Sequence, residues 1–179
     1  PGNGRLEKMS SGRYIGELLR LVVCSLLDKG LLAGSQDKER FHTPNLLNGE
    51  DVAIFTGDTT HNSRVTEQWL EGRLQVRGST LEDRQALHAV ALLVSTRAAR
   101  LVTASYLGIL QHIDPDLKKQ HTIAIDGSLY EKMPGFPEAM DIAFAQVLGS
   151  KAKQVSTVLS KDGSGLGAAI ATAIAVHAE

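Results

Sequence analysis

The chain has 179 residues, of which 42% are hydrophobic and 22% are charged, and its formal net charge is -1. This is the composition of one ordinary soluble globular domain, without the basic excess of a nucleic-acid-binding protein or the polybasic patch of a membrane-surface protein. The apolar run 18–27 is interrupted by Arg20 and is too short to cross a bilayer. The single cysteine, Cys24, excludes a disulfide framework and favours a reduced thiol in a cytoplasmic protein.

The first predicted element is a helix. Apolar residues recur at helical spacing from Tyr14 to Leu27, and Lys29 with Gly30 forms a stop signal. The residues before this helix read as a loop, which contains Glu7. In that position the carboxylate could accept hydrogen bonds from the hydroxyls of a sugar, or it could complement the positive end of the helix. The residues alone favour the second interpretation.

A polar, irregular stretch follows at 31–48, and residues 52–55 predict a short strand or a docking segment. Short polar side chains then cluster at 58–63, a segment that includes Thr59 and Ser63. This cluster could bind a phosphate or a ribose. A loop in which Ser63 caps the next helix is the simpler interpretation, and the residues alone favour it.

A long helix is predicted next. Ser79 and Glu82 fit a capping box with Ser79 as the N-cap, and the apolar pattern then runs unbroken to about Ile113. At 1.5 Å per residue, such a helix would be roughly 45–50 Å long. Its middle is rich in alanine, serine and glycine, which favours close packing against a neighbouring element.

The last third of the chain predicts strand, turn and helix, twice. In chain order these are a strand at 121–125, a turn at 126–128, a helix at 137–148, a strand at 154–159, a turn at 162–164 and a helix from 168. Two strands joined by a crossover helix lie parallel, so both Asp-Gly-Ser turns should open on the edge where ligands of α/β proteins bind. We therefore expect the two turns to line one pocket; the alternative is that Asp-Gly-Ser is a common turn sequence without a ligand. Two strands cannot cover so many helices, so we also expect further strands encoded before Pro1.

The second of these turns is rich in glycine, with Gly163, Gly165 and Gly167 at alternate positions. Such a turn lets a backbone approach a ligand closely, and the free N–H groups of the following helix favour an anion. A nucleotide is the first hypothesis, and a plain tight corner is equally compatible with the glycines alone. No histidine pair has metal-ligand spacing, and neither a P-loop motif nor a nucleophile elbow is present.

Four motifs, in order along the chain, resemble the hexokinase/glucokinase family. They are Pro-Gly at 1–2 with Glu-Lys-Met-Ser-Ser-Gly-Arg-Tyr-Ile-Gly-Glu at 7–17, Ala-Ala-Arg-Leu at 98–101, Ile-Asp-Gly-Ser-Leu-Tyr at 125–130 with Pro-Gly-Phe at 134–136, and Asp-Gly-Ser-Gly-Leu-Gly-Ala-Ala at 162–169. Any one of these would be a weak signal. Together they keep the order and rough spacing of that family from one end of the chain to the other.

The resemblance implies an α/β fold. This would be a partial actin-like ATPase (ribonuclease H-like) domain, rich in helices and ending in a strand–helix–strand–helix unit. Residues 1–179 would form the C-terminal, nucleotide-side part of the hexokinase large domain, truncated at its N-terminus. The implied activity is that of an enzyme of glycolysis, which phosphorylates glucose or a related hexose at its 6-hydroxyl with ATP. Magnesium would be held mainly through the nucleotide phosphates.

The resemblance also assigns binding residues. Glu7 matches the glutamate that hydrogen-bonds the sugar hydroxyls. The positions matching the ATP site are Gly12 and Arg13 near the phosphates, Thr59 and Ser63 approaching the nucleotide, Gly127 and Ser128 at phosphate and ribose, and Gly163, Ser164, Gly165 and Gly167 on the adenosine side. No residue of this chain matches a catalytic base or a metal ligand.

Some positions depart from the family. Gly4 lacks a side chain that often reaches the sugar, and Glu131 stands where some members carry a lysine near the phosphates. The phosphate loop and the catalytic aspartate of the family would fall before Pro1, and phosphoryl transfer needs all of these groups in one closed site. We therefore expect the 179 residues alone to be inactive.

The expected partners are hexose, ATP and the rest of the same polypeptide, with neither nucleic acid nor a membrane segment. Exposed apolar helix faces would also favour self-association. The alternative is a non-catalytic, regulatory hexokinase-like module that binds nucleotide or sugar. A third possibility, an unrelated helical interaction domain, would leave the paired Asp-Gly-Ser turns unexplained.

Overall fold

The computed structural model describes residues 3–32 and 37–177, so Pro1 and Gly2 of the first motif lie outside the described residues. The α-helices are α1 (Arg5–Ser10), α2 (Gly12–Asp28), α3 (Gly49–Gly57), α4 (Arg64–Gly72), α5 (Leu81–Ile113), α6 (Ser128–Lys132), α7 (Phe136–Leu148) and α8 (Gly163–His177). The strands are β1 (His121–Ile125) and β2 (Val155–Leu159), and short 3-10 helices cover Lys38–His42, His61–Ser63 and Gly149–Gln154.

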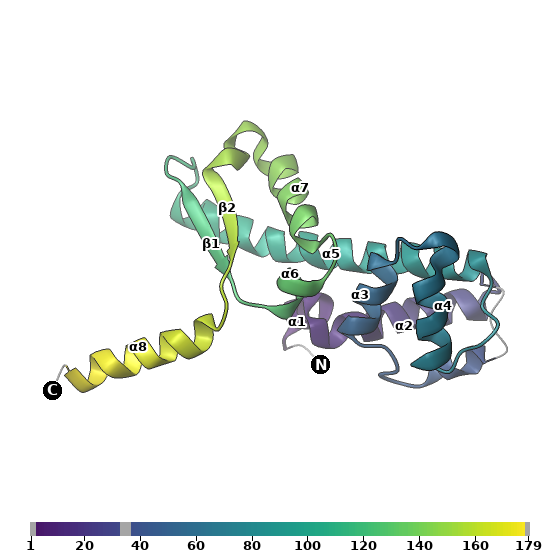
Figure 1. The fold of residues 1–179 in the computed structure, drawn as a ribbon. Helices are drawn as coiled ribbons and strands as arrows, with labels where there is room; N and C mark the ends of the chain where they lie inside the picture. The colour runs from purple at the N-terminus through teal and green to yellow at the C-terminus, as the bar shows by residue number, and fades with distance from the viewer. Residues whose placement is uncertain (1–2, 33–36, 178–179) are drawn as a thin grey trace.

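The long helix α5 is the element against which most other helices pack, and its predicted extent is confirmed. It packs against α1, α2, α3 and α7, which lie along it in Figure 1. Ala91, Ala98 and Ala99 are completely buried, because small side chains let neighbouring helices approach closely. By length and composition α5 could also cross a membrane. Packing against four helices accounts for part of this composition, while Leu93 and Ile109 on other faces of α5 are 70% and 57% exposed.

The capping box of α5 lies one residue later than predicted. Thr80 is the N-cap: its hydroxyl accepts a hydrogen bond from the Asp83 backbone N–H, and Thr80 N donates to Asp83 Oδ2, both at 3.1 Å. Ser79 was the wrong choice because two overlapping Ser/Thr-x-x-acid patterns occur here and only packing separates them. The carbonyl and hydroxyl of Ser79 instead accept hydrogen bonds from Arg84 Nη1.

The strand predicted at 52–55 is wrong, because these residues belong to the helix α3. Asn48 starts α3 with a complete capping box, in which its Oδ1 accepts from the backbone of Glu50 and Asp51 and its own N–H donates to Asp51 Oδ2. Val52 and Phe55 lie three positions apart on one face and are both fully buried. Four apolar residues are too few to distinguish periods of 2 and 3.6, so the cap was the better signal.

The loop predicted before the first helix is also corrected. Residues 5–10 form α1, which packs against α2 and α5, and Ser11 ends α1 and begins α2. Gly4 precedes α1 in the left-handed conformation, with φ 68°. At the other end of α2, Gly30 adopts the left-handed φ of 66°, as the stop signal predicted.

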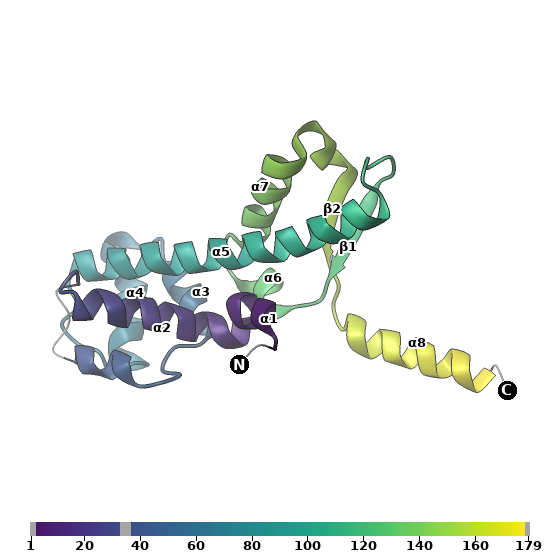
Figure 2. The same ribbon diagram turned by 180° about the vertical axis from the view of Figure 1, so that it is seen from behind.

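The C-terminal unit has the predicted parallel pair of strands. β1 and β2 are in register from His121 opposite Val155 to Ile125 opposite Leu159, and α6 and α7 form the crossover. The helix α8 begins at Gly163, earlier than the predicted start at 168, so the glycine stretch is helical. Figures 1 and 2, seen from opposite sides, both show α8 extending away from the rest of the molecule.

Candidate functional site

A cavity of about 500 Å³ lies between the beginnings of α2 and α3 and the helix α6. The residues that line it are Gly12, Asn48, Gly49, Glu50, Ala53, Ser128, Leu129, Lys132 and Met133. This volume lies in the range of small-molecule and cofactor sites, roughly 300–1,000 Å³. Gly12 and Ser128, predicted from motifs far apart in the sequence, therefore come together at one cavity.

Glycines let the walls of this cavity approach each other. A Cβ added to Gly49 would lie 2.9 Å from the carbonyl oxygen of Gly12. A Cβ added to Gly16, one turn further along α2, would lie 2.4 Å from both the Leu47 carbonyl oxygen and Asn48 Cα. These contacts place residues 47–49 directly against α2. The sequence prediction missed Gly16, although a glycine inside a strongly apolar helix is a recognised signal of close backbone approach.

The two helices that begin at the cavity differ in whether side chains accept hydrogen bonds from the backbone N–H groups of their first turns. Ser11, the N-cap of α2, makes no side-chain cap hydrogen bond, and the first turn of α2 holds no acidic residue. Its hydroxyl is buried and has no hydrogen-bond partner in the described part of the chain. In α3, by contrast, Asn48 caps the helix and two carboxylates complement its positive end. The start of α2 can therefore attract an anion more strongly than the start of α3.

The polar segment 58–63 forms a loop that is organised by Asp58. This carboxylate accepts hydrogen bonds from the backbone and hydroxyl of Thr60 and from the backbone and hydroxyl of Thr66. Burial alone would raise the pKa of Asp58, but these hydrogen bonds outweigh it and hold the pKa at about 2. Ser63 occupies the N-cap position of α4 as predicted, yet its side chain makes no cap hydrogen bond. In the first turn of α4, Val65 N donates instead to the Thr60 hydroxyl and Thr66 N donates to Asp58 Oδ2.

Thr59 lies beside the main cavity but outside its lining. It is exposed and lines a smaller hollow of about 180 Å³, which shares Ala53 of α3 with the main cavity. The end of the same loop is fixed from α5, where the buried Arg84 donates from Nε and Nη2 to the carbonyl oxygen of Asn62, each at 3.2 Å. Asn62 and Ser63 both have left-handed backbone angles, so this loop needs such support.

The two Asp-Gly-Ser turns lie next to each other, as the parallel strands require. A Cβ added to Gly163 would lie 3.6 Å from Asp126 Oδ2, and Ser160 N donates to the carbonyl oxygen of Ile125 at 2.8 Å. Lys161 Nζ also lies 3.2 Å from Glu131 Oε1, so an ion pair connects the second turn to α6.

The remaining nucleotide-side glycines do not meet at the main cavity. Gly127 is exposed just before α6, at φ 170°, an extended conformation open to any residue. Gly165 and Gly167 are exposed on α8, and a Cβ added to Gly167 would meet nothing within 4 Å. Ser164 lies on the same helix, beside Gly163. Among the described lining residues of the main cavity, none comes from α8.

Glu7 and Arg13 lie near the start of α2 but outside the lining of the cavity. Glu7 is exposed in the first turn of α1, with Oε2 3.3 Å from the position of a Cβ added to Gly4. It therefore lies on a helix, where a loop was predicted. Arg13 is exposed on α2, and its guanidinium carbon lies 5.6 Å from the centre of the Tyr14 ring.

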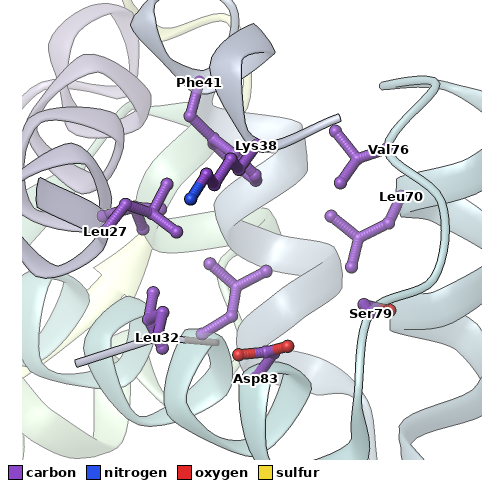
Figure 3. Close-up of a pocket in the computed structure, with 10 residues that line it drawn as sticks. Leu27, Leu32, Lys38, Phe41, Leu70, Val76, Ser79 and Asp83 are labelled. Carbon is purple, nitrogen blue, oxygen red and sulfur yellow. The ribbon is translucent and has the colours of Figure 1, made fainter. Parts of the chain in front are cut away.

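A second cavity lies at the far end of α2, and Figure 3 shows it as an apolar space between Leu27, Leu32, Phe41 and Val76. Its volume of about 40 Å³ is too small for a nucleotide. In residues 3–32 and 37–177, no group of three or more His, Cys, Asp or Glu side chains is placed to hold a metal ion. A further hollow of about 390 Å³ is lined by residues that no motif predicted, namely Asp141, Phe144, Ala152, Val155, Ser156 and Thr157. The main cavity, which brings Gly12 and Ser128 together, is therefore the best candidate for a ligand site in the described structure.

Comparison with known proteins agrees with the four motifs. A family model described as Hexokinase matches residues 1–174. Hexokinase-7 of Oryza sativa subsp. japonica is 34% identical over 177 residues, which is 97% of this chain and 38% of that protein. Hexokinase-1 of Saccharomyces cerevisiae is 35% identical over 178 residues, which is 97% of this chain and 36% of that protein.

The fold is similar to that of solved hexokinase structures. Hexokinase from Schistosoma mansoni complexed with glucose superposes with a TM-score of 0.77 at 32% identity, covering 92% of this chain and 36% of that one. A second hexokinase crystal structure superposes with a TM-score of 0.71 at 20% identity, which supports the fold alone. The chain thus spans between a third and two fifths of the length of the relatives that it matches.

Proposed function

The chain belongs to the hexokinase family, and from that premise we propose that residues 1–179 form the nucleotide-side part of an ATP-dependent hexose kinase. The complete enzyme would transfer the terminal phosphoryl group of ATP to the 6-hydroxyl of glucose or a related hexose. One observation carries this proposal: Gly12 and Ser128, from two separate family motifs, line the same cavity of about 500 Å³.

In this proposal the nucleotide phosphates lie at the start of α2. The uncapped N–H groups of α2 and the exposed hydroxyl of Ser128 are hydrogen-bond donors, and the positive end of the helix favours phosphate charge. Gly12 leaves room there, because a Cβ would point toward Leu129 and Ser128 at 3.6 and 3.8 Å. Arg13, Thr59, Ser63 and Gly127 are proposed as outer contacts of the nucleotide.

The adenosine side is assigned to the beginning of α8, with Gly163, Ser164, Gly165 and Gly167. These residues follow the turn that lies beside Asp126, at the carboxyl end of β1 and β2. Glu7, in the helix immediately before α2, is the proposed contact to the hexose hydroxyls, because an exposed carboxylate is a strong hydrogen-bond acceptor.

We place magnesium on the nucleotide, not on a protein site. A magnesium ion keeps several water ligands and commonly binds through substrate phosphates with one or two carboxylates, which fits a cavity that offers the single carboxylate of Glu50. When bound, it would neutralise phosphate charge. No residue of the described chain is proposed as the base for the sugar hydroxyl, so the 179 residues alone are proposed to be inactive, in a cytoplasmic enzyme.

Calorimetric titration of the 179-residue chain with ADP tests the nucleotide site. We expect binding that the substitution Gly12→Val abolishes, because the added methyl groups would project toward Leu129 and Ser128. Gly108→Val is the matched control, since Gly108 is exposed on α5 with open space around it. Absence of ADP binding by the unsubstituted chain would refute the nucleotide site.

A coupled assay of sugar-dependent ATP turnover tests whether catalysis needs residues outside the 179-residue chain. We expect turnover from a protein that also contains the catalytic residues of the family, and none from the 179 residues alone. Turnover by the 179 residues would overturn the proposed inactivity. Nucleotide binding without turnover in the longer protein would favour a regulatory, non-catalytic module.

A further inference from the structure

We propose that Lys132 binds the phosphate oxygens of the nucleotide in the cavity at the start of α2. This inference rests on the proposed nucleotide site and adds a residue that no motif match assigned. Lys132 is the one cationic side chain among the described residues that line the cavity. It shares that lining with Gly12, so the ammonium group and the positive end of α2 act on the same space.

The ammonium group of Lys132 is available to a ligand. The side chain is exposed, and in residues 3–32 and 37–177 it makes neither a hydrogen bond nor an ion pair within 4.0 Å. Its three N–H donors are therefore not occupied by other groups of the described chain. A lysine ammonium also acts as a point charge for phosphate without needing one fixed geometry.

The neighbouring acid does not neutralise this charge. Glu131 is paired with Lys161 at 3.2 Å, which directs its carboxylate toward the turn after β2. Glu131 therefore interacts with the turn after β2, while the next residue of α6, Lys132, lines the cavity. The residue at position 131 departs from the lysine of some family members, and the cation one position later supplies a positive charge to the same region.

The backbone at Lys132 is held in place because α6 is anchored at its middle residue and just beyond its last one. Tyr130 donates a hydrogen bond from its hydroxyl to Thr157 Oγ1 at 2.8 Å, which connects α6 to β2. Met133 is 4% exposed and belongs to the hydrophobic core. Pro134 then packs against α3, where a Cβ added to Gly57 would lie 2.9 Å from its Cγ. A five-residue helix with such anchors holds its last side chain at one wall of the cavity.

The opposite charge in the cavity narrows the class of ligand. Glu50 lines the same space from the first turn of α3, and it forms no ion pair with Lys132 within 4.0 Å. The cavity therefore has a cationic part and an anionic part. A nucleoside diphosphate with its magnesium ion matches both, because phosphate oxygens accept hydrogen bonds from an ammonium while the cation that they carry attracts a carboxylate.

The test compares ADP with adenosine on variants of the 179-residue chain. We expect Lys132→Met to weaken ADP binding about five- to tenfold, the effect of losing one charge pair near a protein surface. Adenosine binding should change less than about twofold, because adenosine carries no phosphate. Lys132→Arg should restore most of the ADP affinity. Lys118→Met is the matched control, since Lys118 is an exposed lysine in the α5–β1 connection and lies outside the cavity.

The outcomes separate the two proposals. If the unsubstituted chain binds ADP and Lys132→Met binds it equally well, the role of Lys132 is wrong while the nucleotide site stands. Equal weakening of ADP and adenosine would also overturn it, because the lysine would then act on the structure of the site and not on phosphate. If the unsubstituted chain binds neither ligand, the nucleotide site itself fails.

Discussion

Two parts of the molecule carry similar glycine-rich signals and have opposite environments. Around the start of α2, a Cβ added to Gly16 would lie 2.4–2.5 Å from backbone atoms of residues 47 and 48. At the start of α8, a Cβ added to Gly167 would meet nothing within 4 Å. The added Cβ atoms of Gly163 and Gly165 would lie close to side-chain atoms of their own turn, Ser160 Oγ at 2.8 Å and Asp162 Oδ1 at 2.5 Å. In the first region glycine is thus required by backbone packing between distant segments, whereas in the second it meets mainly local side chains or open space. A glycine motif does not say which of these it is.

The apolar residues of the two helices show the same contrast. Ile15 and Leu19 of α2 are fully buried, whereas Leu166, Ile170 and Ile174 of α8 are 61%, 51% and 66% exposed. In the described structure α2 is stabilised by tertiary contacts, while α8 depends mainly on its own backbone hydrogen bonds, which are marginal for fifteen residues. Stability and ligand binding should therefore respond very differently to changes in the two regions.

The largest expected effect is that of Gly16→Val. The new side chain would overlap the backbone of residues 47 and 48, so we expect the free energy of unfolding to fall by about 3 kcal/mol or more. Urea unfolding can be followed by fluorescence of Trp69, the single tryptophan, whose Nε1 donates to the buried Asp51. The control Gly167→Ala should change stability by less than about 1 kcal/mol. Equal losses of unfolding free energy for the two variants would contradict the difference between the two regions.

Next in size is Arg84→Met. Its guanidinium donates to the carbonyl oxygens of Asn62 and Ser79 and to the carboxylate of Glu67, and the side chain is nearly buried. Removal leaves these acceptors without donors, so we expect a loss of about 2–4 kcal/mol in urea unfolding. Arg64→Met, at an exposed position on α4, should stay within about 0.5 kcal/mol. A loss below about 1 kcal/mol for Arg84→Met would contradict its proposed support of the loop.

A smaller effect is expected from acid at Asp58. Its pKa is lowered from 3.8 to about 2 in the folded protein, so its contribution is present above about pH 4 and is lost as the pH falls toward 2. We expect Asp58→Asn to cost about 1–2 kcal/mol near neutral pH, less than the full shift because the carboxylate is partly exposed. It should also flatten the pH dependence of stability between pH 4 and 2. The control Asp141→Asn, at an exposed position on α7, should keep the slope.

The smallest effect on stability is expected in α8. The double substitution Leu166→Ser with Ile170→Ser should change the free energy of unfolding of the packed region by less than about 0.5 kcal/mol. It should nevertheless reduce self-association, because it removes neighbouring apolar side chains from an exposed helix face. Sedimentation at increasing concentration measures this. A clean monomer for the unsubstituted chain at high concentration would contradict the proposed association.

Long or strongly patterned elements were predictable from the sequence. The apolar spacing of α2, the unbroken pattern of α5 and the parallel pair β1 and β2 are all confirmed by the structure. Short segments were not, since residues 5–10 and 52–55 are helices that depend on a cap or on packing against α2 and α5. The family also followed from the order of four motifs, because several spaced matches rarely coincide by chance.

Within the candidate site, the sequence selected Gly12 and Ser128 but not Asn48, Gly49 or Lys132. The latter three belong to no motif, and they matter only because packing against Gly12 and Gly16 carries their segments to the same space. Apolar periodicity therefore determined the long helices and the pair of strands, and the ordered motifs determined which family the chain belongs to. The tertiary structure alone decided which side chains share a cavity, because that depends on close contacts between residues far apart in the chain.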